Sequence, residues 1–452
     1  MELKKYKKKR ITPQGWKEVT LADAFNTSSG ATPLSTEASY YENGTIPWIN
    51  SGELASPYIY GTTNFISQAG FENSSTEIYP IDTVLVAMYG ATAGKASLLK
   101  MEACTNQAIC AILPNKDYSS TFLKYSIDTL YDHLVGLSSG SARDNLSQAE
   151  LKKLKLIMPP TKDEQNKLVS ILALIDRKIE LNRAINQNLE AMAKQLYDYW
   201  FVQFDFPDEN GRPYKSSGGE MVWNEKLKRE IPKGWNVLKL GEHCSFNKRT
   251  SNGYFNHPIL YLDTSNITNN TIDELQFLNL SSDIIPSRAR RLVQEGDIVY
   301  STVRPNLKHF GIIMNPDYNM VVSTGFAVIT ANWSAYRYFI YQFLIQAATI
   351  ENLSTIAQSA VSAYPSINTS DIENLDLVVP PDSMIEKYAK TACRLYLQID
   401  TNYKEIKSLT KQRDELLPLL MNGQVSVNSD LSVYKKRRGK VPSSILNDVS
   451  DI

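Results

Sequence analysis

The chain contains two segments in which the same features follow one another in the same order. A Pro-x-Gly-Trp turn at residues 13–16 recurs at 232–235, and alternating apolar residues follow each copy. Further along, IDTVLV at 81–86 corresponds to GDIVYS at 296–301, and both patterns are typical of a short buried strand after a turn. Self-similarity over so long a period indicates a duplicated domain.

Both segments also close in the same way. A Pro-Pro pair stands at 159–160 and again, 221 positions later, at 380–381. One such pair could match by chance, but the apolar residues before it match in the same register. The matching positions are Leu146, Leu151, Leu154 and Leu156 in the first segment and Ile367, Ile372, Leu375 and Leu377 in the second. We therefore interpret the 452 residues, too many for one ordinary domain, as containing two copies of one domain.

After each Pro-Pro pair the apolar period lengthens from two residues to between three and four, which predicts a long helix. The two helices correspond to one another, as Ile175-Asp176 and Ile399-Asp400 show. A mostly apolar seam that repeats every seven residues is typical of a coiled coil, so we expect the helices to pair; packing of each helix on its own domain is the alternative. We expect buried Lys178, Asn182 and Asn402 to fix the alignment rather than to add stability. The predicted seam consists of Ile171, Ile175, Lys178, Asn182, Ile185, Leu189, Met192, Leu196 and Tyr199 on the first helix, and of Leu395, Ile399, Asn402, Ile406, Leu409, Arg413, Leu416 and Leu420 on the second.

The net charge does not by itself indicate a nucleic-acid-binding protein, because 48 acidic and 48 basic side chains cancel. Affinity for DNA must then come from local clusters or from a partner subunit. The four cysteines contain no Cys-x-x-Cys pair, which indicates reduced thiols. No apolar run is long enough to span a membrane, and the charged start has no apolar stretch behind it, so we expect a soluble, cytoplasmic protein.

Catalytic motifs are scarce in this sequence. It has no glycine-rich dinucleotide or phosphate loop and no His-Glu-x-x-His zinc motif. A nuclease-like Glu-x-Lys pattern occurs only at 405–407, inside the second predicted helix, where surface charge explains it better. The histidines are scattered without the spacing of metal ligands; they are His133, His243, His257 and His309. We therefore expect a chain that binds a partner and does not catalyse, with no cofactor or metal of its own.

One region resembles the central helical part of type I restriction-modification specificity subunits. It covers residues 173–206 and reads ALIDRKIELNRAINQNLEAMAKQLYDYWFVQFDF. Further phrases of that family surround it, in the family's order: GTIPWINSGEL, LVAMYGATAGK, IPKGWNVLKLGE, GDIVYSTVRPN and VSTGFAV. The resemblance extends from about residue 12 to about residue 425.

The resemblance implies an α+β fold with two similar target-recognition domains, separated by two long helices that form an antiparallel coiled coil with pseudo-two-fold symmetry. Each domain would read one half of a split site on double-stranded DNA, while the helices set the gap and dock two modification (methyltransferase) subunits. Those partners would bind S-adenosylmethionine and methylate adenine at N6. Separate restriction subunits, the motor-nucleases, would use ATP and Mg²⁺ and cleave unmodified DNA.

On this basis we divide the chain into six segments. They are a first target-recognition domain at 1–158, a first helix at 159–203, a linker rich in Gly, Pro and Ser at 204–229, a second target-recognition domain at 230–379, a second helix at 380–424 and a polar tail at 425–452. The tail contains the basic run 435–438, for which a solvated terminus is a simpler explanation than a phosphate contact.

Base reading needs donors and acceptors on short loops, and phosphate contacts need Lys, Arg and hydroxyl groups. Four polar segments with cations meet this need, at 88–95 and 139–143 in the first domain and at 287–291 and 301–308 in the second. The alternative for the arginines of the second domain is pairing with Asp283, Glu295 or Asp297. The predicted DNA contacts are Tyr89, Thr92, Lys95, Ser141, Arg143, Arg288, Arg290, Arg291, Thr302, Arg304, Asn306 and Lys308.

Two other functions remain open at this stage: a stand-alone nuclease or methyltransferase fragment, and a coiled-coil adaptor that binds no DNA. A chain that modified or cut DNA without partners would indicate the first, and failure to bind any DNA would indicate the second. We interpret Trp16, Trp48 and Trp235 as core aromatics rather than as stacking platforms for bases. The bases recognised and the length of the gap do not follow from one sequence.

Overall fold

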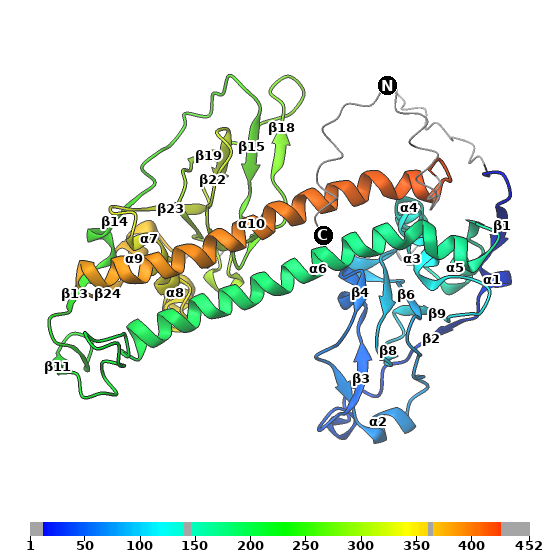
Figure 1. The fold of residues 1–452 in the computed structure, drawn as a ribbon, viewed down its shortest axis with the longest axis horizontal. Coiled ribbons are helices and arrows are strands. Elements are labelled where there is room, and N and C mark those ends of the chain that lie inside the picture. Colours follow the sequence, from blue (N-terminus) through cyan, green and yellow to red (C-terminus); the bar gives the residue numbers. More distant parts are fainter. Residues whose placement is uncertain (1–11, 140–145, 360–364, 426–452) are drawn as a thin grey trace. The chain divides into compact units, whose positions relative to one another are not determined.

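The computed structural model describes residues 12–139, 146–359 and 365–425. It divides into two units, one made of the chain up to Glu180 together with the chain from Ile406, and the other of Leu181–Glu405 (Figure 1). The boundary therefore crosses both predicted helices, so that each unit contains one copy of the repeated domain and a part of each helix. The predicted tail lies outside the described residues, except for its first residue.

The first unit is built on a five-stranded and a three-stranded sheet. The larger sheet has the order β2 (Thr27–Ser29), β9 (Ile109–Ile112), β6 (Val84–Ala87), β7 (Ala96–Leu99) and β4 (Tyr58–Ile59), and the smaller has the order β5 (Phe65–Ile66), β3 (Ile46–Ile49) and β8 (Cys104–Thr105). β1 (Lys17–Thr20) pairs with β10 (Lys155–Met158). The helices are α1 (Leu21–Ala24), α2 (Gln68–Glu72), α3 (Ser120–Asp128), α4 (Tyr131–Ser139) and α5 (Gln148–Lys152).

The second unit repeats this plan with two four-stranded sheets. One has the order β14 (Cys244–Phe246), β23 (Phe326–Ala331), β20 (Ile298–Ser301) and β21 (Phe310–Ile312), and the other has the order β18 (Gln276–Leu278), β15 (Ile259–Leu262), β22 (Met320–Ser323) and β19 (Ala289–Leu292). Three two-stranded pairs complete it: β11 (Met221–Asn224) with β12 (Arg229–Pro232), β13 (Asn236–Lys239) with β24 (Asp376–Val379), and β16 (Ile267–Thr268) with β17 (Thr271–Ile272). Its helices are α7 (Tyr336–Leu344), α8 (Ala347–Ser359) and α9 (Thr369–Glu373).

Equivalent strands pair in the same sense in the two units. The antiparallel pairs β1–β10 and β6–β9 correspond to β13–β24 and β20–β23, and the parallel pair β3–β8 corresponds to β15–β22. The turn that opens each copy is also the same. Trp16 N donates to Pro13 O and Trp235 N donates to Pro232 O, both at 3.1 Å, while Gly15 and Gly234 take φ of 85° and 84°, which a side chain would disfavour. These pairings confirm the duplication.

The two long helices are α6 (Lys162–Tyr197), which continues into the π turn η4 (Asp198–Val202), and α10 (Asp382–Met421). Inside the second unit Asn182 Nδ2 donates to Glu405 Oε2 at 2.8 Å, and Asn402 Nδ2 donates to Asn186 Oδ1 at 2.8 Å. Later residues of α6 thus meet earlier residues of α10, which makes the pairing antiparallel. Asn182 and Asn402 are buried, as predicted, and such buried amides specify register.

On α10 every predicted seam residue is buried or half-buried, whereas on α6 the prediction is correct at one of its two rows and wrong at the other. Ile175, Asn182, Ile399 and Leu420 are buried and Leu189, Leu196, Ile406, Leu409 and Leu416 are half-buried, but Ile185 and Met192 are 44% and 53% exposed and Lys178 is exposed. Ile179, Asn186 and Ala193 are buried instead, one residue further along. The heptad of α6 therefore runs four then three from Ile175, not three then four.

The row that contains Asn186 and Ala193 is buried, although it is more polar than the row that contains Ile185 and Met192, because its side chains have partners inside the seam. Asn186 hydrogen-bonds across to Asn402, and its Nδ2 also donates to the Ile399 carbonyl at 3.3 Å, so its amide is satisfied inside the seam. Ala193 is small enough to sit in the core of the second unit. Apolar character alone favoured Ile185 and Met192, which instead face outward.

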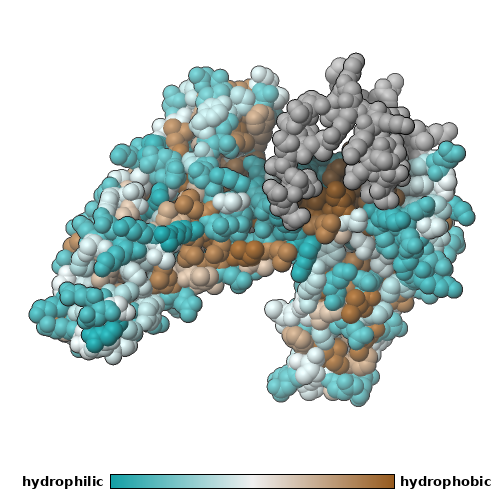
Figure 2. All heavy atoms as spheres, viewed as in Figure 1, coloured by the Kyte–Doolittle hydropathy of each residue, from teal (hydrophilic) through white to brown (hydrophobic). Residues whose placement is uncertain are grey.

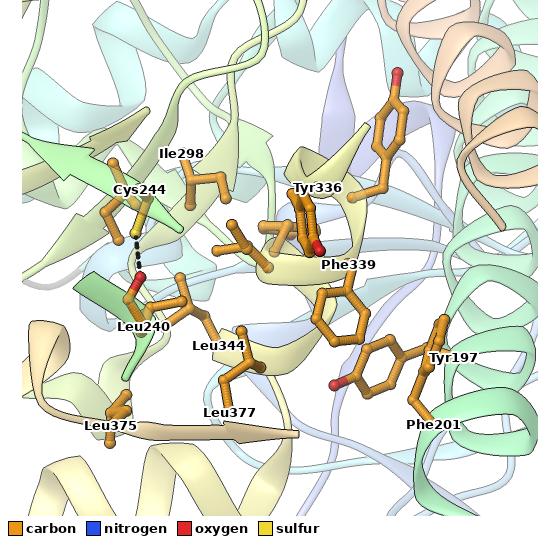
Figure 3. Packing of buried hydrophobic residues seen from close by; sticks show 14 of the residues in the cluster. Tyr197, Phe201, Leu240, Cys244, Ile298, Tyr336, Phe339, Leu344, Leu375 and Leu377 are labelled. Carbon is orange, nitrogen blue, oxygen red and sulfur yellow. Dashed lines mark hydrogen bonds between the residues drawn. The ribbon is translucent and has the colours of Figure 1, made fainter. Parts of the chain in front are cut away.

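Aromatic rings pack together in one part of the core of the second unit, where Figure 3 shows Tyr197, Phe201 and Phe339 close to one another. The Phe201 and Phe339 rings meet edge to face at 4.7 Å between centroids, and Tyr197 packs beside both. The segment predicted as a linker contributes to this core: Phe204 and Phe206 are buried, and Phe206 stacks on Trp235 at 5.2 Å. Residues 204–229 thus anchor the second domain to the end of α6.

The tryptophans behave as predicted, since Trp48 and Trp235 are buried and Trp16 packs at the edge of the Phe122 ring. All four cysteines lie in the described part of the chain and are free thiols. Burial raises the pKa of Cys104 to about 11 and those of Cys110 and Cys244 to about 12, so these thiols are poor nucleophiles. No helix among the described residues is long and apolar enough to cross a membrane.

Candidate nucleic-acid interface

In the second domain, strand β20 ends in a tight loop that presents cations. The loop contains the short turn η7 (Pro305–Leu307), and Arg304 and Lys308 on either side of it have φ of 48° and 57°. Left-handed backbone costs a residue with a Cβ roughly 1–2 kcal/mol, and such strain is found preferentially at functional loops. Arg304, Asn306 and Lys308 are all exposed, so the side chains predicted to contact DNA point into solvent.

Backbone hydrogen bonds bring the two predicted basic segments of this domain together. Thr302 donates through both its N–H and its hydroxyl to Gly325 O, at 2.9 and 3.0 Å. The neighbouring residue, Thr324, donates its N–H to Arg288 O at 2.8 Å. The turn between β22 and β23 therefore joins the Arg288 segment to the Arg304 segment at one end of the domain.

The carboxylates proposed as alternative partners of these arginines are engaged elsewhere. Asp297 is buried and pairs with Arg249 at 2.5 Å, and Glu295 lies 3.7 Å from Arg337. Asp283 accepts from the backbone N–H of Asn279 at 2.8 Å, which closes its own loop. Within the described residues, none of the three pairs with an arginine of the 287–291 segment, so these carboxylates do not occupy Arg288, Arg290 or Arg291.

The three arginines of that segment differ in exposure. Arg290 donates to the carbonyls of Ser287 and Asn252 and covers Gly253, where a Cβ would lie 2.6 Å from its guanidinium carbon. Arg291 is half-buried and donates to Thr250 Oγ1 at 3.3 Å, and burial lowers its pKa. Both therefore brace the loop before β15. Arg288 is exposed and is the one of the three best placed to reach DNA.

The first domain carries a related loop after β6. Gly90 and Gly94 have φ of 76° and 81°, four positions apart like Arg304 and Lys308; Gly90 is the first residue of the turn η3 (Gly90–Thr92), and Gly94 lies two residues after its end. Tyr89 is exposed, Thr92 Oγ1 donates to Ser51 O at 2.8 Å, and Lys95 lies 4.3 Å above the Tyr131 ring. Thr92 thus holds the loop in place, and Lys95 carries the charge. Ser141 and Arg143 lie outside the described residues.

A group of amides that no predicted segment contains lies beside this loop. Asn106 Nδ2 donates to Asn50 Oδ1 at 3.2 Å, and exposed Gln107 follows Asn106 in the turn between β8 and β9. Met88 N, at the start of the η3 loop, donates to Ala108 O at 2.8 Å, which fixes the turn against that loop. Asn50 belongs to the family phrase GTIPWINSGEL, which was a signal for it; the turn at 106–108 had no comparable signal.

An apolar row on α6 and η4 faces outward in the second unit. Figure 2 shows hydrophobic side chains in a band along the helices there. The exposed members are Leu181, Ile185, Met192, Tyr199 and Val202, with exposures from 37% to 53%. Their spacings of three, four and seven residues place them on one helix face, and an exposed apolar row of this kind is typical of a protein-binding surface.

No group of three or more His, Cys, Asp and Glu residues that could hold a metal ion occurs in residues 12–139, 146–359 and 365–425. Of the histidines, His243 packs 4.9 Å from the Tyr336 ring, and burial lowers its pKa. His309 Nδ1 donates to Ile267 O, 2.7 Å away, inside the domain. Both contacts are of a structural kind.

Comparisons with known proteins agree with this organisation. The model of the type I restriction modification DNA specificity domain matches residues 13–191 and 232–411. The type I restriction enzyme MjaIX specificity subunit of Methanocaldococcus jannaschii is 29% identical over 431 residues, covering 92% of this chain and 94% of that protein. The EcoR124I/EcoR124II specificity subunit of Escherichia coli is 23% identical over 198 residues, covering 42% of this chain and 48% of that protein.

A solved structure shares the fold. The S subunit of a type I restriction-modification system from M. genitalium matches with a TM-score of 0.56 at 17% identity, covering 91% of this chain and 97% of that chain. The family model covers both copies of the repeat and the greater part of the chain. This chain therefore belongs to the type I restriction-modification DNA specificity family, with two copies of the specificity domain.

Proposed function

We propose that this chain is the DNA-recognition subunit of a type I restriction-modification complex, in which each domain reads one half of a bipartite target on double-stranded DNA. The duplication carries this proposal. Two domains with the same strand pairings each hold a rigid loop after the equivalent strand, β6 or β20, with the exposed polar or cationic side chains that DNA contacts require.

The long helices set the gap between the half-sites and dock two modification subunits. The buried Asn182 and Asn402 support the first role, because amides inside a coiled coil fix its register. The apolar row on α6 supports the second, because exposed apolar surface of this extent is costly unless a partner covers it. Two equivalent domains would give two docking positions.

Chemistry is assigned to the partners rather than to this chain. The modification subunits would bind S-adenosylmethionine and methylate adenine at N6, and the restriction subunits would use ATP and Mg²⁺ to move along DNA and cut it. The absence of a glycine-rich nucleotide loop or a zinc motif from the sequence supports this division. Such an assembly would act on DNA in the cytoplasm.

An exchange of domains tests the proposal. Residues 12–158 are replaced by the first domain of another family member, the hybrid is expressed with its modification subunits, and methylated sites are mapped across a genome. We expect one half of the target to change while the other half and the gap stay the same. A change in both halves would contradict independent reading by two domains.

Light scattering of the co-purified complex tests the partner stoichiometry, for which we expect two modification subunits per chain. A ratio of one to one that persists with excess partner would contradict it. The other functions have their own signatures: a purified chain that methylated or cut DNA alone would be an enzyme, and one that bound no DNA even with its modification subunits would be an adaptor.

A further inference from the structure

The turn between β8 and β9 holds the same place in the first domain as the β22–β23 turn holds in the second. Ala108 O accepts from Met88 N at 2.8 Å, and Gly325 O accepts from Thr302 N at 2.9 Å. In both cases the donor begins the loop that carries predicted DNA contacts. In the second domain the same turn also holds Arg288 through Thr324. DNA that contacts the cations of both segments must cover the turn that joins them. Because the β8–β9 turn occupies the equivalent position in the first domain, we expect DNA bound there to cover that turn as well.

The first-domain turn carries two amides, and only one of them is available to a ligand. Asn106 is used inside the domain, since its Oδ1 accepts from Ala108 N at 3.1 Å and its Nδ2 donates to Asn50. Gln107 is exposed, and its Oε1 accepts from the Thr32 hydroxyl. Within the described residues the structure gives its Nε2 no partner. Gln107 therefore presents a free donor next to an acceptor that has one lone pair left.

The orientation of this amide is set by a rigid support. Thr32 stands in a segment whose backbone is held by two aromatic side chains: Trp48 Nε1 donates to Ala31 O at 3.0 Å and Tyr41 Oη donates to Pro33 O at 2.6 Å. At Gly30 a Cβ would lie 1.9 Å from Thr105 O, so only glycine allows this segment to reach the β8–β9 turn. Because the Thr32 hydroxyl holds Gln107 Oε1, the other end of the amide, Nε2, is presented at a fixed position.

We propose that Gln107 reads an adenine in the half-site bound by the first domain. In the major groove adenine presents an acceptor, N7, beside a donor, the N6 amino group, and a glutamine amide matches both at once. Guanine presents two acceptors there, which the oxygen of Gln107 would repel, and cytosine offers no acceptor for the nitrogen. This inference rests on the proposed function and names one determinant of its specificity.

The test uses the full chain expressed with its modification subunits, with methylated sites mapped genome-wide. The variants are Gln107→Ala, which removes the amide, and Gln107→Glu, which keeps its shape but replaces the donor with an acceptor. Gln68→Ala is the matched control, because Gln68 is an exposed glutamine of the same domain whose amide donates to the nearby Glu72 side chain. Thermal melting of each complex shows that the variants are folded.

We expect Gln107→Ala to methylate its original sites about tenfold to a hundredfold more slowly and to lose preference at one position of the first half, where the wild type requires an A·T pair. Gln107→Glu should also lose the preference for adenine, and any remaining preference at that position should be for cytosine. The second half and the control should not change. An unchanged motif in both Gln107 variants, or relaxation at a G·C pair, would overturn the inference. If the wild-type complex methylates without any sequence preference, the proposed function itself fails.

Discussion

Lys308 and Lys228 allow a backbone effect to be separated from a charge effect. Both are exposed lysines of the second unit with left-handed backbone, at φ of 57° and 52°, but Lys308 ends the η7 loop and Lys228 lies in the turn between β11 and β12. Glycine relieves roughly 1–2 kcal/mol of strain at such a position and costs roughly 0.5–1 kcal/mol through the unfolded chain. We expect Lys308→Gly and Lys228→Gly each to raise the free energy of unfolding by roughly 0–1.5 kcal/mol.

The effects of the two substitutions on DNA binding should differ. Log affinity falls as log salt rises. If Lys308 contacts a phosphate, its loss makes this slope shallower by about 0.9, whereas Lys228→Gly leaves the slope unchanged. Between 50 and 200 mM salt, this slope change corresponds to a roughly threefold to fourfold smaller loss of affinity for Lys308→Gly than for the wild type. Fluorescence anisotropy of the complex on a duplex containing its target, titrated at four salt concentrations, measures both slopes.

Equal slopes for the wild type and Lys308→Gly would show that this lysine does not contact phosphate. A second possibility is that the glycine substitution deforms the loop, and Lys308→Ala serves as the control for this. Alanine removes the same charge but retains the strained Cβ, so it should show the same slope as glycine with lower stability. If the slope changes with glycine and not with alanine, the backbone rather than the charge is responsible, and the reasoning from a cationic loop is refuted.

Two further predictions concern α6. Burial raises the pKa of Glu190 to about 7 in spite of a hydrogen bond from Asn270, so the stability that its neutral form provides below its ordinary pKa of 4.5 is lost as the pH rises through about 7. The advantage of Glu190→Gln over the wild type in free energy of unfolding, measured in urea, should therefore be about 1–3 kcal/mol larger at pH 8 than at pH 5. Parallel pH profiles of the two proteins would contradict this. Met192→Glu, on the apolar row, should weaken binding of the modification subunit at least tenfold in calorimetry, while Gln187→Glu, an exposed site on the same helix, should not; similar affinities for both variants would remove the row as a docking surface.

Local patterns predicted much of the fold because the interactions behind them are local. The Pro-x-Gly-Trp turns follow from the positive φ of Gly15 and Gly234, and β6 and β20 appear as short apolar runs after turns. The choice between Ile185 and Asn186 for the buried row could not be made in this way. It depends on Asn402, more than two hundred residues further along, which satisfies the Asn186 amide only once the helices have paired.

The candidate interface was predictable in part for the same reason. Runs of cations at 287–291 and 301–308 are visible in the sequence, but their meeting at the β22–β23 turn depends on backbone hydrogen bonds from Thr302 and Thr324. Gln107 belongs to no charged or glycine-rich run. Gln107 became a candidate because Thr32, 75 positions away, hydrogen-bonds to its amide and because the sheets place it on an exposed turn.

The spacing role of the helices can be tested by lengthening both of them together. One heptad inserted after Asn186 in α6 and one after Gln398 in α10 keep the four-then-three spacing and leave the Asn186–Asn402 and Asn186–Ile399 hydrogen bonds on one side of the insertion. Seven residues at 1.5 Å add about 10 Å. At about 3.4 Å per base pair, the preferred gap should grow by about three base pairs, provided that rotation about the duplex is tolerated.

A matched control inserts the heptad in α6 alone. The two paired helices then differ in length, so we expect a lower melting temperature and weaker DNA binding rather than a new gap. Methylation mapping reads the gap directly, because both half-sites appear in each methylated sequence. If the double insertion leaves a folded, active complex with the original gap, the helices do not determine the distance between half-sites. The two domains would then have to be positioned by the modification subunits, and the buried amides of the seam would serve only to align the helices.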